Sequence, residues 1–176
     1  MSILKDIGIG ILLLLISVIL VAVVASYAAA GASRITSNTD WRNNPNLASA
    51  HTKLSWAASV GWIYVSLIII LIILLIVFAA TGVIDFGLSD VLEVQSLPAI
   101  LNFVNISTVI VLLIIGILSA IGTAEINGDT QGAKSKALTA TLLSLGTIGL
   151  VIIYYIVNYF IKEMQKRKRI EQIRET

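Results

Sequence analysis

His51 is the only histidine of the chain, and the chain contains no cysteine. An imidazole can act as an acid, a base or a metal ligand, but each role needs a partner such as a second histidine, a thiolate or a carboxylate. The nearest carboxylate in the sequence, that of Asp40, lies 11 positions away. We therefore expect no catalytic residue, no metal site and no cofactor, and we predict that the protein is not an enzyme.

A second set of residues suits the recognition of a partner. Cationic and aromatic groups gather just before a long aliphatic run, at Trp41, Arg42, His51 and Lys53. Tryptophan and arginine are enriched where proteins contact one another. This set predicts a docking surface for a protein outside the membrane.

The C-terminal tail, KEMQKRKRIEQIRET, is basic, with its charge concentrated at Lys166, Arg167, Lys168 and Arg169. Basic clusters next to a membrane span attract anionic lipid headgroups. Ordinary anchoring on the positive side of the membrane explains the same cluster. We expect the tail to contact lipid or an acidic protein; nucleic acid is less favoured but stays open.

The elements that position these residues are membrane helices. Of the 176 residues, 57% are hydrophobic and 12% are charged, outside the range of soluble domains. A spanning helix needs roughly 20 apolar residues. Four stretches qualify, at about 7–32, 54–84, 100–123 and 138–161. The expected fold class is an all-α integral membrane protein with four transmembrane helices in the lipid bilayer.

Small residues recur at helical spacing in the second half of the first and third spans. Small side chains allow neighbouring membrane helices to approach closely. The first span offers two such registers, one at positions 22, 26 and 30 and the other at 25, 29 and 33. The packing residues that we predict are Ala22, Ser26, Ala30, Gly116, Ala120 and Ala124.

The second span has a polar run-up that begins at Asn44 and Pro45. Asparagine suits a helix N-cap and proline the first helical position. A helix from Pro45 to about Thr81 is roughly 55 Å long at 1.5 Å per residue, whereas the hydrocarbon core is about 30 Å thick. We expect residues 45–56 to extend above the membrane. One stripe of this extension carries Leu47, Ala50, His51, Leu54 and Ala58.

The run-ups to the second and fourth spans resemble each other. AHTKLS at residues 50–55 matches AKSKALT at residues 133–139 with one insertion. We predict two helical hairpins, residues 1–84 and 99–161, related as a parallel internal repeat. An acidic loop, 85–98, joins them, and a basic helical tail, 162–176, follows. Basic residues of the tail favour both termini on the cytoplasmic or interior side.

An Asn-rich loop, the stretch AHTKLSWAASVGW at residues 50–62, a long aliphatic span and a second such hairpin form the overall pattern. This pattern resembles the small multi-span inner-membrane virion proteins of large icosahedral double-stranded DNA viruses. The resemblance implies a structural protein or scaffold in the virion inner membrane, with capsid or membrane-associated proteins as partners. It assigns no functional residue.

A different class of function stays open, namely a small channel or transporter subunit that works as a homo-oligomer. No charged residue lies clearly inside a span, so a proton-coupled pump is not expected. The polar residues that could line a pore are Thr139, Ser144 and Thr147, or Asn102 and Asn105.

Overall fold

The computed structural model describes residues 2–81, 96–128 and 130–174. In these ranges the secondary structure is entirely helical and includes four long helices, each with a segment long and apolar enough to cross a membrane. This result confirms the predicted fold class. The helices are α1 (Ser2–Thr36), α2 (Pro45–Thr81), α3 (Ser96–Glu125) and α4 (Ala133–Arg174), with a short 3₁₀ turn, η2 (Thr130–Gly132), before α4.

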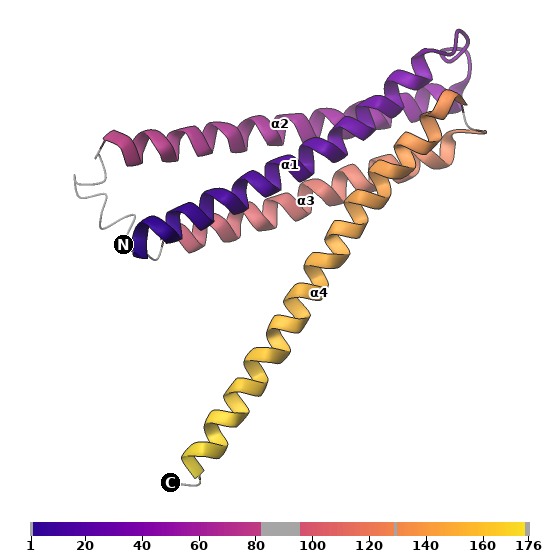
Figure 1. The fold of residues 1–176 in the computed structure, drawn as a ribbon. Coiled ribbons are helices and arrows are strands. Elements are labelled where there is room, and N and C mark those ends of the chain that lie inside the picture. The colour runs from indigo at the N-terminus through magenta and orange to yellow at the C-terminus, as the bar shows by residue number, and fades with distance from the viewer. Residues whose placement is uncertain (1, 82–95, 129, 175–176) are drawn as a thin grey trace.

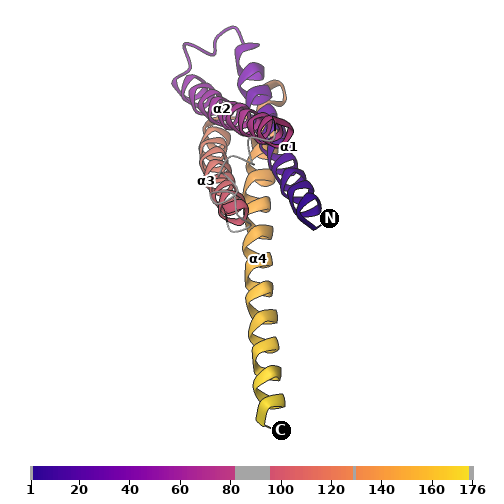
Figure 2. The ribbon, with the colours of Figure 1, turned by 90° about the vertical axis from the view of Figure 1, so that its left-hand side faces the viewer.

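The helices α1, α2 and α3 run side by side, and α4 joins them only at one end (Figure 1). That end, which we call the loop end, also holds the α1–α2 loop and the turn before α4. Seen from the side, α4 leaves the other helices and its C-terminal half stands apart (Figure 2). Helices α1 and α3 each contact all three of the others, whereas α2 and α4 are joined mainly through them.

The start of α2 agrees with the sequence prediction. The Asn44 side-chain oxygen Oδ1 accepts hydrogen bonds from the backbone N–H groups of Asn46, at 3.1 Å, and Leu47, at 3.3 Å. These bonds satisfy two of the free N–H groups at the helix N-terminus. Helix α2 then continues without interruption to Thr81. That residues 45–56 extend above the membrane stays a prediction.

Two other boundaries differ from the predicted ones. Helix α3 begins at Ser96, two residues before Pro98. This start is compatible with the proline, because proline is tolerated in the first turn of a helix. Helix α4 begins at Ala133, so the polar run-up of the fourth span is helical from its start. Most of the predicted acidic loop lies outside the described residues, and the tail is helical to Arg174.

Buried side chains form two clusters along the bundle. The cluster at the loop end draws on α1, α2 and α4 and on Ile126, which directly follows α3, and it is flanked by Trp41 of the α1–α2 loop. Its residues are Ala32, Ile35, Leu47, Ala50, Leu54, Ile126, Ala133 and Ala137. The second cluster fills the middle of the bundle, and Ala140 is the only residue of α4 among its buried members in the described part of the chain. The loop end is therefore where the four helices hold together.

Close helix approach depends on glycines that face other helices. A Cβ atom added at Gly61 of α2 would lie only 2.6 Å from the Cβ of Ala25 in α1. Leu54 is fully buried at the loop end, where a Cβ at Gly31 or at Gly122 would each meet its side chain at 3.2 Å. These contacts allow the backbones of α1, α2 and α3 to approach as small residues do in membrane bundles.

The predicted packing register is only partly the one that the fold uses. Gly116 is buried, and Ala22, Ala30 and Ala120 are half-buried. Ser26 and Ala124 are exposed, so within the single chain they do not contribute to the packing of the bundle, and their predicted role stays a prediction. A small side chain permits contact on any face of the helix, and only the neighbouring helices decide which face is covered. The buried small residues of α1 are Ala25, Ala28, Gly31 and Ala32.

The parallel repeat stays a prediction, but burial supplies a related observation. At a spacing of 83 positions, the buried residues Ala50, Leu54, Ala57 and Gly61 of α2 correspond to the buried residues Ala133, Ala137, Ala140 and Ser144 of α4. The two helices therefore bury the same register over their first three to four turns. Beyond that point they differ, because α4 leaves the bundle.

Candidate functional site

Three of the four residues predicted to dock a partner lie together at the loop end. The ring centroids of Trp41 and His51 are 4.6 Å apart, with the planes tilted by 40°. The guanidinium carbon Cζ of Arg42 lies 5.3 Å from the centroid of the Trp41 ring. We call Arg42, Trp41 and His51 the cation–aromatic stack. Such an arrangement is favourable because the aromatic face carries partial negative charge.

The stack rests on an ordered base. Trp41 is half-buried and packs against the cluster of apolar side chains at the loop end. Successive turns of the loop are closed by backbone hydrogen bonds from the N–H of Asn38 to the carbonyl of Ile35, at 3.1 Å, and from the N–H of Trp41 to the carbonyl of Asn38, at 3.3 Å. The loop therefore holds the tryptophan in place and leaves Arg42 exposed beside it.

A shallow groove continues from the stack along α2. It has a volume of about 250 Å³ and is lined by His51, Thr52, Ser55, Trp56 and Ser59. Trp56 is 63% exposed although it is one of the largest apolar side chains of the protein. Helix positions three or four apart share a face, so this groove and the stack form one continuous surface. We call this surface, the stack with the groove, the docking face.

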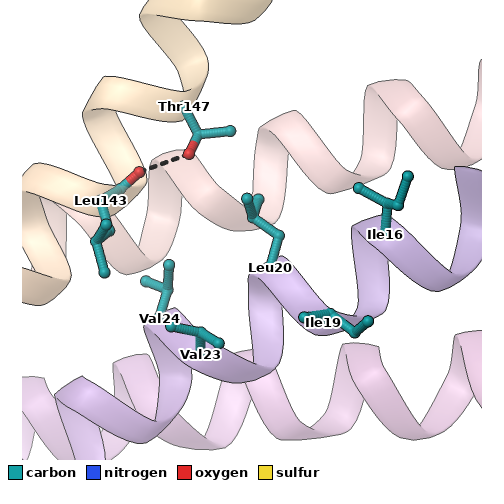
Figure 3. A pocket seen from close by; sticks show the side chains of 7 residues that line it. All are labelled: Ile16, Ile19, Leu20, Val23, Val24, Leu143 and Thr147. Carbon is teal, nitrogen blue, oxygen red and sulfur yellow. Dashed lines mark hydrogen bonds between the residues drawn. The ribbon is translucent and has the colours of Figure 1, made fainter.

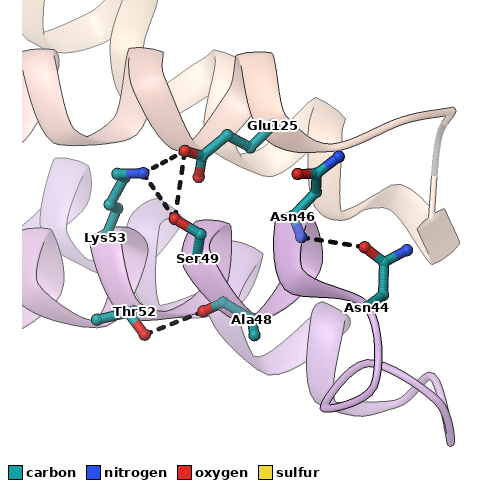
Figure 4. A network of polar contacts seen from close by, with 7 residues as sticks. All are labelled: Asn44, Asn46, Ala48, Ser49, Thr52, Lys53 and Glu125. Carbon is teal, nitrogen blue, oxygen red and sulfur yellow. Dashed lines mark hydrogen bonds and ion pairs between the residues drawn. The ribbon is translucent and has the colours of Figure 1, made fainter.

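Lys53, the fourth predicted docking residue, has a different role. Its Nζ forms an ion pair with Glu125 Oε1, at the end of α3, and donates a hydrogen bond to Ser49 Oγ at 2.8 Å (Figure 4). Ser49 Oγ also donates to Glu125 Oε1 at 3.2 Å. The ammonium thus joins α2 to α3 inside the chain. Lys53 therefore lies apart from the other three predicted docking residues, with its charge paired to Glu125, and its part in docking stays a prediction.

The Lys53–Glu125 pair was missed by sequence reasoning. The sequence offered one signal: Glu125 is the single acidic residue at the end of the third span, and Lys53 is the single basic residue in the run-up to the second span. A charge at the membrane boundary needs a partner or water. Only the packing of α2 on α3 shows that these two residues meet. Glu125 Oε2 is buried and makes no hydrogen bond among the described residues.

A second polar link joins α2 to α3 deeper in the bundle. The Tyr64 hydroxyl lies 2.7 Å from Thr108 Oγ1 and 3.0 Å from Ser107 Oγ, and it donates to the Val104 carbonyl at 3.1 Å. Hydrogen bonds between membrane helices tie them together. This group contains no acid, base or metal ligand set, so its contribution is structural.

The polar residues proposed for a pore are mostly engaged within helices. Thr139 Oγ1 donates to the carbonyl of Ser135, at 2.9 Å, and Thr147 Oγ1 to that of Leu143, at 2.7 Å. Ser144 is buried and its Oγ donates to the carbonyl of Leu112 in α3. Asn102 is exposed and Asn105 is half-buried in α3. A single chain does not gather these residues around one path.

The basic tail is the last group of residues for which the sequence predicts a contact. Lys166 is exposed on α4, whereas the side chains of Arg167, Lys168 and Arg169 lie outside the described residues. Within the described part of the chain, no group of three His, Asp or Glu side chains could hold a metal ion.

No family model, curated protein or solved structure matches this chain. The site must therefore be interpreted from its own geometry.

Proposed function

We propose that the protein is a structural membrane protein that anchors a membrane-associated assembly by its docking face. The observation that carries the proposal is the cation–aromatic stack, which presents Arg42 on a half-buried Trp41. An arginine and a tryptophan held in fixed positions are the side chains that most often dominate binding energy between proteins. Following the resemblance of the sequence, the assembly is a virion in which an inner membrane is linked to the capsid.

The construction of the loop end supports this proposal. All four helices meet there, and its apolar cluster and the Lys53–Glu125 pair fix the helices under the docking face. A surface that is already ordered loses little conformational entropy when a partner binds. An anchor needs such a rigid surface next to its membrane spans.

The channel or transporter alternative lacks a comparable observation. Ser144 and Thr147 direct their hydroxyl groups to backbone carbonyls, and the crevice beside Thr147 is lined by apolar side chains. Pore residues need polar atoms that remain free to replace the hydration of a solute. Flux measurements on the protein in liposomes test this alternative, and solute transport by the purified protein would favour it.

Crosslinking in the native membrane or particle, followed by mass spectrometry, tests the anchor. We expect links between the loop end and a non-membrane protein. Arg42→Glu reverses the charge above Trp41, so it should abolish these links while carbonate extraction still finds the protein inserted in the membrane. Links that persist in Arg42→Glu would contradict the proposed face.

Arg34→Gln is the matched control. Arg34 is also an exposed arginine at the loop end, but its Nη1 contacts the carbonyl oxygen of Gln131, at 3.4 Å, away from the stack. Its replacement should leave partner links unchanged. Equal losses in both variants would indicate general attraction to positive charge rather than a defined surface.

A further inference from the structure

The divergence of α4 from α1 opens a crevice on the side of the bundle. Its volume is about 270 Å³, and its lining comes only from these two helices. The residues are Ile16, Ile19, Leu20, Val23, Val24, Leu143 and Thr147 (Figure 3). The hydroxyl of Thr147, the one polar side chain in the lining, donates to the Leu143 carbonyl at 2.7 Å. The crevice therefore offers no free polar side chain to water.

The ammonium group of Lys136 lies between the same two helices, α1 and α4, on the side of the crevice nearer the loop end. Lys136 Nζ of α4 is 5.3 Å from the ring centroid of Tyr27 in α1. Leu143 and Thr147 follow Lys136 by seven and 11 positions, and Val23 and Ile16 precede Tyr27 by four and 11. These spacings place each set on one face of its helix. The Lys136–Tyr27 contact is thus the polar end of the apolar crevice.

The charge of Lys136 has no anionic partner among the described residues. Glu125, an acidic residue at the same end of the bundle, is paired with Lys53 instead. Tyrosine and lysine side chains are typical of the level at which lipid headgroups meet the hydrocarbon core. Helical rise places Leu143 about 10 Å and Thr147 about 16 Å below Lys136. One leaflet of the hydrocarbon core is about 15 Å deep. The crevice therefore has the depth of one acyl chain whose headgroup lies at Lys136.

We propose that this crevice binds one anionic phospholipid, with an acyl chain between α1 and α4 and its phosphate at Lys136. An apolar crevice that ends at a cation matches the polarity of a phospholipid, in which an apolar chain is joined to an anionic headgroup. The positive charge at one end selects an anionic headgroup.

Native mass spectrometry of the full chain, released from membranes that contain phosphatidylglycerol and phosphatidylcholine with identical acyl chains, tests the site. The wild-type protein should retain one phosphatidylglycerol with about a fivefold preference, the size of effect expected from one basic residue near the membrane surface. Lys136→Gln should remove this preference. Equal retention of the two lipids by the wild-type protein would overturn the proposal.

Lys134→Gln is the control for charge, because Lys134 lies two positions before Lys136 and therefore on another face of α4. It should keep the preference. If both lysine variants lose it equally, the binding is diffuse and the site does not exist as proposed.

Leu143→Trp tests the apolar part of the site, since Leu143 lines the crevice and is 41% exposed. The larger side chain should fill the crevice and lower retention of lipid at least fivefold. Leu142→Trp, at an exposed neighbour outside the crevice, should retain lipid like the wild type. Equal behaviour of the two tryptophan variants, or a dimer without bound lipid, would exclude the acyl-chain site.

Discussion

Helices α2 and α4 begin alike and end differently. Both bury an alanine near their start at the loop end, Ala50 in α2 and Ala133 in α4. Helix α2 then stays in the bundle, with buried residues as far as Ile72. In α4 the last buried residue among those described is Ser144, after which the helix stands apart. Two helices that bury the same positions near their start can therefore stay packed in the bundle over different lengths.

The difference follows from particular pairs of residues, 83 positions apart. Gly61 of α2 permits close contact with Ala25 of α1, whereas Ser144, its counterpart in α4, donates to the Leu112 carbonyl of α3 and is the last buried residue of α4 among those described. Tyr64 reaches across to α3 through its hydroxyl, whereas its counterpart Thr147 bonds the backbone of its own helix. Without hydrophobic attraction between helices in lipid, close packing and polar links decide association.

The largest effect should come from Gly61→Leu, which would break the part of the molecule that stays packed. The new side chain would clash with Ala25, whose Cβ lies 2.6 Å from the position of a Cβ at residue 61. We expect a loss of about 3 kcal/mol in the free energy of unfolding, the upper part of the usual range for overpacking. Unfolding of the purified protein in mixed micelles measures this loss.

Gly149→Leu is the matched control on α4. A Cβ at Gly149 would have no neighbour within 4 Å, so we expect less than about 0.5 kcal/mol, as for other substitutions away from packed sites. A similar loss at both glycines would show that α4 packs as tightly as α2.

Leu54→Ala should have the second largest effect. Leu54 is fully buried beside Gly31 and Gly122, so its truncation leaves a cavity that rigid helices do not fill. We expect about 2 kcal/mol, the lower end of the range for such changes, because membrane lipid is as apolar as the core. The same unfolding measurement checks it.

Leu150→Ala provides the comparison for Leu54, because Leu150 is 69% exposed on the free part of α4. Its truncation should leave the free energy of unfolding within about 0.5 kcal/mol of the wild type. A loss as large as that of Leu54→Ala would mean that another chain covers this part of α4.

The ion pair at the loop end should contribute less. In a double-mutant cycle with Lys53→Met and Glu125→Gln, we expect a coupling of about 1 kcal/mol, the upper end for pairs that are in partial contact with water. The pair joins α2 to α3 and has about a quarter of each side chain exposed. A coupling near zero would show that the two helices are held by packing alone.

The smallest effects should come from the hydroxyl links of the two helices to α3. Tyr64→Phe removes the link of α2, and Ser144→Ala removes the link of α4 to the Leu112 carbonyl. Hydrogen bonds between membrane helices average about 0.6 kcal/mol, so we expect a loss of this size for each. Spin labels on α3 and α4 should also report wider separation in Ser144→Ala, and no change in Tyr64→Phe.

The residue types of the candidate site could be predicted from the sequence, but which residues of those types lie in the site could not. Trp41, Arg42 and His51 stand out in sequence because aromatic and cationic groups are concentrated before a span, and the fold brings them together. Lys53 has the same chemistry but faces α3, where Glu125 binds it. The lysine at position 136 could not be assigned to a crevice, because the crevice exists only where α4 diverges from α1.

The sequence alone predicts the helices, since four apolar stretches of sufficient length can each satisfy their own backbone polar groups in a membrane only as helices. It also determined the start of α2, because Asn44 and Pro45 act on neighbouring residues. The tertiary structure decided which small residues pack, which lysine is paired and where α4 leaves the bundle. Those outcomes depend on contacts between distant segments, and similar apolar helices offer several equivalent faces until their neighbours are in place.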